Sequence, residues 1–227
     1  MMLFPMSLLV VELFLIASQC IYSTVDSAQT AVHLESAPHQ AVRLVHHSFE
    51  AHCQQQQSIH MQGSCDVDIR VDINGNQIKF YESVIFTELR SIFGVSDELM
   101  HACLDPTRLE AISADSKSGQ AFWRSSDGLV VLKTIKPYEC KNLRRVLSQY
   151  QRHVTGDHSS ISGVLGVFRV RLRSGRKIYM MACKNVYHFD KRASASATGT
   201  LGQQQSRSLK FDLKGSTVGD LHTSMGQ

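Results

Sequence analysis

Three short turn signals, each lying between two apolar runs, constrain the fold of this chain more than any other feature. They are Asn74-Gly75, Asp127-Gly128 and Ser174-Gly175. Asn, Asp and Gly readily adopt the positive φ angles that tight hairpin turns need, and short runs rich in apolar residues on either side are typical of strands. The sequence therefore predicts a sheet built largely of antiparallel hairpins.

Between these hairpins, apolar residues recur at helical spacing. The run 80–93 ends before Gly94, which suits the end of a helix, and another run begins after Pro137 and ends before Gly156. The segment Asp97–Cys103 predicts a further short helix. We therefore expect an α+β fold, with a twisted, mainly antiparallel sheet and packed helices.

Several segments are expected to lie outside this fold. Residues 1–20 are hydrophobic, but the apolar run Leu3–Ala17 is shorter than the ~20 residues of a spanning helix. No Lys or Arg precedes it, so a signal peptide would be atypical, and a remnant of a membrane region is an equal alternative. Residues 21–65 show no sustained helical or strand periodicity of apolar residues, which predicts a disordered linker or arm. The main domain then covers 66–227, with a disordered, Ser-, Ala-, Gly- and Gln-rich insertion at 191–208.

The net charge of +4 conceals an asymmetry along the chain. Residues 1–116 hold 5 Lys and Arg against 14 Asp and Glu, whereas residues 117–227 hold 19 against 6. The strongly cationic second half favours a polyanionic partner such as a membrane, a nucleotide or a nucleic acid. The alternative is that these cations simply lie on solvated surface faces. The six cysteines show no metal-ligand spacing, so we expect free thiols in a reducing compartment and no metal site.

The stretch from Ser118 to Thr134 carries the main chemical hypothesis. A small-residue turn with Gly119 and an aromatic residue, Phe122, precede an apolar strand that ends in Lys133. Backbone amides of a tight glycine turn can approach phosphate oxygens, and a strand-borne ammonium group can hold them electrostatically. Periodicity alone favours an ordinary surface lysine, so the hypothesis needs a second signal.

That second signal is the segment Phe211–Thr217, which reads Phe-Asp-Leu-Lys-Gly-Ser-Thr. Here the chain resembles the phosphatidylinositol phosphate kinases, whose signature includes Asp-Leu-Lys-Gly-Ser. The resemblance covers residues 78–220. Further segments that follow in the family's order are residues 80–94, 118–122, 132–134, 143–154, 167–172 and 179–181.

The resemblance implies the amino-terminal lobe of a kinase that uses ATP and Mg²⁺ to phosphorylate a phosphatidylinositol monophosphate. The favoured reaction is transfer to the 5-position of the 4-phosphate lipid. Catalytic roles fall to Lys214, which would bind phosphate, and to Asp212, which would position that lysine, with an ion pair at a strand edge as the alternative. Since relatives place their catalytic aspartates after this signature, we expect this chain to lack the catalytic lobe and to be inactive alone. The residues implied in ATP binding are Ser118, Gly119, Phe122 and Lys133.

Cations near Ser174-Gly175 predict a lipid contact, because arginines that alternate with apolar residues share one face of a strand. A solvated strand face is an equal alternative. The predicted lipid-binding set is Arg169, Arg171, Arg173, Arg176 and Lys177.

The resemblance also implies partners and a location for the protein. The partners are ATP, phosphoinositides and an anionic membrane surface, and a homodimer remains open. The location is cytoplasmic and peripheral to membranes, with the plasma membrane favoured. The main rival is a non-catalytic membrane-binding or scaffold module, and no motif supports nucleic-acid binding.

Overall fold

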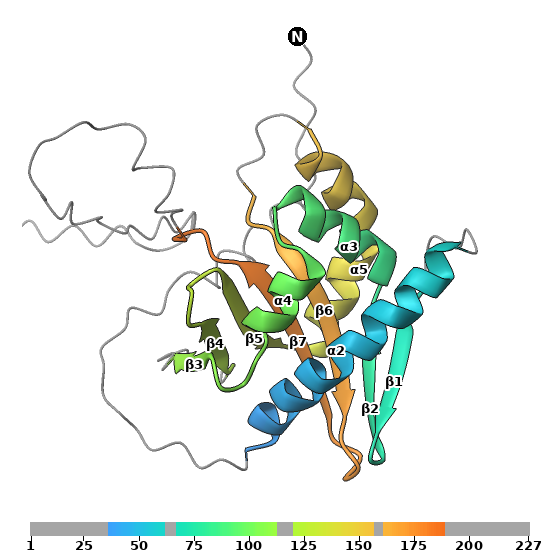
Figure 1. Ribbon diagram of the computed structural model, residues 1–227, viewed down its shortest axis with the longest axis vertical. Helices are drawn as coiled ribbons and strands as arrows, with labels where there is room; N and C mark the ends of the chain where they lie inside the picture. Colours follow the sequence, from blue (N-terminus) through green and yellow to red (C-terminus); the bar gives the residue numbers. More distant parts are fainter. Residues whose placement is uncertain (1–35, 62–66, 113–119, 157–160, 189–227) are drawn as a thin grey trace, which may run out of the picture. The chain divides into compact units, whose positions relative to one another are not determined.

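The computed structural model describes residues 36–61, 67–112, 120–156 and 161–188 (Figure 1). Within these ranges seven strands form one sheet, in which every neighbouring pair is antiparallel and the spatial order is β1-β2-β6-β7-β5-β4-β3. The expected α+β class with a mainly antiparallel sheet is confirmed. The strands are β1 (Ile69–Ile73), β2 (Asn76–Phe80), β3 (Leu109–Ile112), β4 (Phe122–Ser125), β5 (Val130–Ile135), β6 (Val164–Arg171) and β7 (Lys177–Lys184).

All three predicted hairpins are present. Asn74 and Gly75 join β1 to β2 with positive φ angles of 51° and 77°, as a tight hairpin turn requires. Gly128 lies between β4 and β5, and Gly175 lies between β6 and β7, with φ angles of 74° and 87°. Strand β3 was not predicted. Its four residues, Leu-Glu-Ala-Ile, are too few to establish a clear alternation, and none of them is buried.

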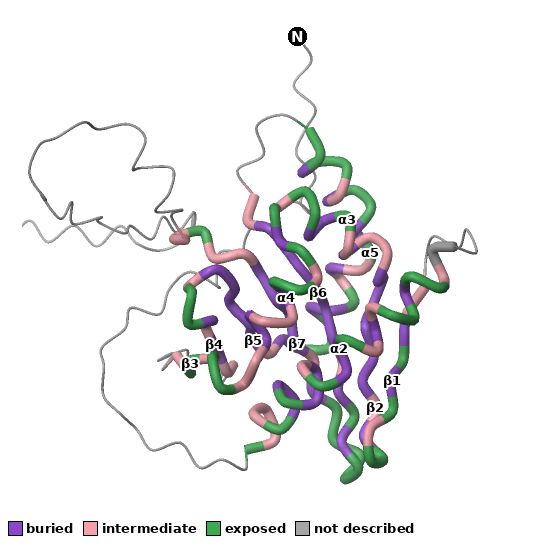
Figure 2. The backbone as a smooth tube through the Cα atoms, in the orientation of Figure 1, coloured by how far each residue is buried: buried purple, intermediate pink, exposed green. Residues whose placement is uncertain are grey.

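One face of the sheet is covered by α2 (Ala37–Met61) and α4 (Asp97–Cys103). The prediction of a linker over residues 21–65 is wrong for residues 37–61, which form a 25-residue helix. Its buried positions recur at helical spacing, but His and Gln residues separate them and obscured the period. Figure 2 shows buried and exposed stretches alternating along α2. The buried residues are Ala41, Val42, Leu44, Val45, Ser48, Phe49, His52 and Gln56.

The other face carries α3 (Ser83–Ile92) and α5 (Pro137–Val154), both of which the sequence predicted. Leu143 and Leu147 of α5 belong to the same buried cluster as sheet residues such as Met181. Tyr150 ties the far end of α5 to β6. Its hydroxyl donates to the carbonyl oxygen of Ser162 at 2.8 Å and accepts the N–H of Val164 at 2.8 Å.

Arg90, at the end of α3, joins three elements through its buried guanidinium. It donates to Asp97 Oδ1 at 2.9 Å, to the carbonyl oxygen of Leu165 at 3.0 Å and to Thr87 Oγ1 at 2.6 Å. Thr87 Oγ1 also accepts from Gln56 Nε2 of α2. Because polar groups this far from water need partners, the network fixes α2, α3 and β6 relative to one another.

The cysteines that the structure describes are free thiols, as expected: Cys53, Cys103, Cys140 and Cys183. Burial raises the pKa of Cys103 to about 12, so this thiol stays protonated at neutral pH. Among the described helices, none has both the length and the apolar character needed to cross a membrane. The hydrophobic segment 1–20 and the insertion 191–208 lie outside the described residues.

Candidate functional site

The central pair of the site lies on the face of the sheet that α5 covers. Lys133 of β5 and Phe122 of β4 are directly opposite each other in the antiparallel register, so their side chains share this face. On its other side Lys133 faces Met181 of β7. The side chain of Lys133 is fully buried, at 0% exposure. An ammonium group held away from water requires an anionic or hydrogen-bonding partner, which makes this lysine unlike a surface lysine.

The chain that leads into Phe122 is anchored beside Lys133. The N–H of Ala121 donates to Thr134 Oγ1 at 2.9 Å, and the N–H of Thr134 donates to the carbonyl oxygen of Ala121 at 2.9 Å. These two bonds extend the β4–β5 pairing by one step. They fix the point at which the predicted nucleotide loop enters the sheet.

The start of α5 is tied to the same loop by a buried carboxylate, Glu139. Its Oε2 accepts from Gln120 Nε2 at 3.2 Å and from the N–H of Lys136, the residue just before the helix. A carboxylate in the first turn that accepts a free helical N–H stabilises the helix start and suits its dipole. Glu139 therefore links the loop, the helix and the strand that carries Lys133.

Four of the predicted site residues lie outside the described residues, so the structure does not place them. Two belong to the predicted nucleotide loop, Ser118 and Gly119. The other two are the predicted catalytic residues, Asp212 and Lys214. In the described ranges, no group of three or more His, Cys, Asp or Glu side chains could hold a metal ion.

The five predicted lipid-binding cations gather around the β6–β7 hairpin. Arg169 and Arg171 alternate on β6, and Arg171 is directly opposite Lys177 of β7. Arg173 and Arg176 lie in the connecting segment, and every member except the half-buried Arg169 is exposed. Like charges directly opposite each other destabilise a sheet, and an anion bound beside them relieves that repulsion.

The neighbouring hairpin adds cations that sequence reasoning missed. Lys79 of β2 is directly opposite Arg169, and Arg70 of β1 is directly opposite Lys79. We call these three residues the cationic row. Arg169 donates to Gln77 Oε1 at 3.4 Å, but its buried Nε has no hydrogen-bond partner in the part of the chain that the structure describes. No local pattern could have revealed the row, because only the register of distant strands brings its members together.

Two carboxylates pair with cations here, Asp68 with Lys79 of the row and Glu82 with the neighbouring Arg144. Asp68 Oδ2 lies 2.5 Å from Lys79 Nζ, and Glu82 Oε1 accepts from Arg144 Nη2 of α5 at 2.6 Å. The Lys79 and Arg144 cations both lie over the ring of Tyr81, at 4.8 and 4.5 Å from its centroid. Burial raises the pKa of Tyr81 to about 12, so its phenol is neutral at physiological pH. This cluster joins the middle of α5 to the residues that flank the β1–β2 hairpin.

An antiparallel sheet with a buried lysine on an inner strand, followed at once by a packed helix, is the arrangement of a kinase amino-terminal lobe. A family model described as Phosphatidylinositol-4-phosphate 5-Kinase matches residues 104–225. The chain belongs to this family of phosphatidylinositol phosphate kinases, as its resemblance indicated.

Its relatives include kinases named for either of two lipid substrates. Phosphatidylinositol 4-phosphate 5-kinases 9 and 8 of Arabidopsis thaliana are 31% and 33% identical, each over 62% of this chain. Phosphatidylinositol 5-phosphate 4-kinase type-2 alpha of Gallus gallus is 28% identical over 63% of it. The matched regions span only 16%, 17% and 32% of these three relatives.

Proposed function

We propose that the protein acts as the amino-terminal, ATP-binding lobe of a kinase that transfers the γ-phosphate of ATP to the inositol ring of a phosphatidylinositol monophosphate, and that this chain is inactive alone. The favoured substrate is the 4-phosphate lipid, phosphorylated at its 5-position, which agrees with the description of the matching family and with the names of the two plant relatives. Kinases of this kind use ATP with Mg²⁺ in general. The proposed place of action is the cytoplasmic surface of a membrane.

The observation that carries the proposal is the buried Lys133 facing Phe122 across β4 and β5. In this proposal the Lys133 ammonium holds ATP phosphate oxygens, and the ring of Phe122 forms an apolar wall next to them. Ser118 and Gly119 supply backbone N–H groups from the loop. Lys214 binds phosphate and Asp212 positions it. Because phosphoryl transfer depends mainly on positioning and on neutralising charge, fixed cations of this kind contribute directly to the rate.

The exposed cations of the β6–β7 hairpin, together with the cationic row, support contact with anionic lipid headgroups. Each Lys or Arg near an anionic surface contributes about 1 kcal/mol at moderate ionic strength. Arg171 and Arg173 are the most informative pair to remove, because both are exposed and neither packs in a core.

One pair of binding measurements tests both parts of the proposal. Lys133→Met should lower the affinity for a fluorescent ATP analogue at least tenfold while circular dichroism shows an intact fold, whereas Lys141→Met, at an exposed position of α5, should leave it unchanged. Replacing Arg171 and Arg173 by Ser should weaken binding to vesicles containing phosphatidylinositol 4-phosphate by roughly 30-fold, about 2 kcal/mol for two contacts. Replacing the exposed Arg145 and Arg152 by Ser is the matched control.

The outcomes separate the two candidate functions. Unchanged nucleotide affinity in Lys133→Met, with vesicle binding that still depends on Arg171 and Arg173, would favour the non-catalytic membrane-binding module. If the Arg171/Arg173 variant and the Arg145/Arg152 control bound vesicles equally well, the β6–β7 hairpin would not be the lipid-binding surface.

A further inference from the structure

A glutamine and a glutamate join the start of β4 to the start of α5 through a side-chain hydrogen bond. Gln120 Nε2 donates to Glu139 Oε2 at 3.2 Å, and the same oxygen accepts the N–H of Lys136 at 2.5 Å. Glu139 is 6% exposed, so its carboxylate depends on these two donors in place of water. The bond to Lys136 is enough to complete the helix start. The bond to Gln120 therefore has a separate structural effect, which is to hold the strand and the helix together.

Gln120 lies on the face of the sheet that carries the candidate nucleotide site. Hydrogen bonds between Ala121 and Thr134 continue the β4–β5 pairing, so the chain around them alternates as a strand does. Side chains two residues apart in a strand point to the same face, and Gln120 therefore shares a face with Phe122. Because Phe122 is directly opposite Lys133, all three side chains lie on this face.

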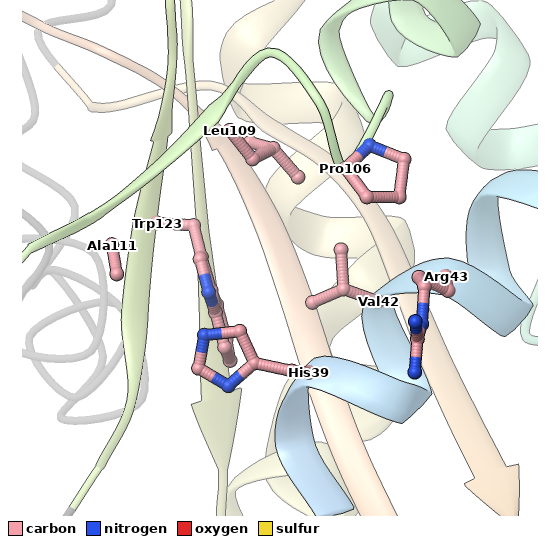
Figure 3. A pocket seen from close by; sticks show the side chains of 7 residues that line it. All are labelled: His39, Val42, Arg43, Pro106, Leu109, Ala111 and Trp123. Atoms are coloured by element: carbon pink, nitrogen blue, oxygen red, sulfur yellow. The ribbon is translucent and has the colours of Figure 1, made fainter. Parts of the chain in front are cut away.

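The adjacent residue, Trp123, agrees with this alternation because its side chain packs on the opposite face. Trp123 belongs to the buried cluster that α2 covers, and Figure 3 shows its ring beside that of His39 at a cavity of about 350 Å³. The candidate nucleotide site and this cavity thus lie on different faces of the sheet. The bond between Gln120 and Glu139 is on the side of the nucleotide site.

This bond holds both elements that carry the site. On one side it fixes the start of β4, where Phe122 is the first residue, and on the other it fixes the start of α5, which follows β5 and Lys133. The end of a strand frays unless further contacts hold it. A site that is already formed loses less free energy when its ligand binds, and phosphate-binding sites depend on such fixed geometry.

We propose that Gln120 and Glu139 are positioning residues for nucleotide binding, an inference that rests on the proposed function of Lys133. Neither side chain touches ATP. Their hydrogen bond holds the start of β4 close to α5, and with it Phe122 beside Lys133, so that the triphosphate meets a site already in its binding shape. This role requires one donor and one acceptor at the two positions, together with an acceptor at position 139 for the N–H of Lys136.

Exchanging the two side chains tests this requirement. Gln120→Glu places two carboxylates where the hydrogen bond was, and it should weaken binding of a fluorescent ATP analogue about tenfold, equivalent to about 1.4 kcal/mol for one lost bond to a charged group. The double variant Gln120→Glu with Glu139→Gln restores a donor and an acceptor, because the amide at position 139 donates to residue 120 while its oxygen still accepts from Lys136. The affinity of this double variant should return to within about twofold of the wild type.

Gln151→Glu is the matched control at the far end of α5. Gln151 Nε2 donates to Glu88 Oε2 of α3, so this variant creates the same pair of carboxylates away from the site and should leave the affinity for the ATP analogue unchanged. An equal loss in Gln151→Glu, or no recovery in a double variant that circular dichroism shows to be folded, would overturn the proposal. Because Lys133→Met tests ATP binding itself, a loss of affinity in that variant with none in Gln120→Glu would refute the positioning role and leave the proposed function intact.

Discussion

The buried histidine of α2 predicts a specific loss of stability in mild acid. The His52 ring stacks on Phe80, with centroids 4.1 Å apart and planes at 18°, and is 2% exposed. Burial, with a smaller contribution from the positive charge of Arg90, lowers the pKa of His52 from 6.5 to about 3. The folded chain therefore holds this ring neutral, whereas the unfolded chain takes up a proton below about pH 6.5.

The sign and size of the effect follow from that difference in proton binding. Above pH 6.5 His52 is neutral in both states and does not change the free energy of unfolding with pH. As the pH falls from 6.5 towards 3, only the unfolded chain binds the proton, and the free energy of unfolding decreases progressively. At pH 5, about 1.5 units below the pKa of 6.5, protonation of His52 stabilises the unfolded chain by about 2 kcal/mol. This is a large share of the ~5–15 kcal/mol that stabilises a typical domain. The pKa of His46 is also lowered, first by burial and then by His101, and adds to the loss in the same direction.

Urea unfolding followed by circular dichroism at pH 7.5 and pH 5 measures this loss. His52→Phe keeps an aromatic ring against Phe80 but cannot be protonated, so it should reduce the stability difference between the two pH values by about 2 kcal/mol. Comparing each variant with itself removes any change in packing. His47→Phe, at an exposed position of the same helix, should retain the wild-type pH dependence. A His52→Phe chain that loses as much stability between pH 7.5 and pH 5 as the wild type would refute the reasoning.

Two further changes should destabilise the fold in ways that the same urea titrations can measure. Tyr150→Phe leaves both the Val164 N–H and the Ser162 carbonyl without the hydroxyl that pairs them, and should cost about 1–3 kcal/mol; a loss below the error of the measurement would contradict this. Arg90→Met leaves the carbonyl of Leu165 without its donor and breaks the link between α3 and β6, for an expected cost of about 1–3 kcal/mol. Wild-type stability in this variant would show that the arginine network is dispensable.

Much of the sheet could be predicted from the sequence because its hairpins have clear local signals. The turn residues Asn74-Gly75 and Asp127-Gly128 lie next to apolar runs, and the strands begin and end where those signals place them, within a few residues. The helices α3 and α5 could be predicted equally well, since a Gly follows the end of α3 and a Pro begins α5. In each case the determining interactions lie within a few residues of one another.

The features that were missed depend on contacts between distant segments. The burial of α2 becomes evident only once the sheet is present to cover residues such as Val45 and Phe49, because His and Gln dominate the composition around them. The cationic row likewise exists only through the pairing of β2 with β6. Of the candidate nucleotide site, the sequence predicted Phe122 and Lys133 as members, but not that the two residues would be direct neighbours.

The place of β6 in the sheet has a practical consequence for anyone who expresses this family's domain. The family model begins at residue 104, yet β6 pairs with β2 on one side and with β7 on the other. A fragment cut at that boundary would lose β1, β2 and the long helix α2. The backbone of β6 would become an open edge, and Phe168 and Val170 would be left facing water. Such a fragment should aggregate, so boundaries for recombinant work are better drawn ahead of Ala37 than at the limits of the sequence match.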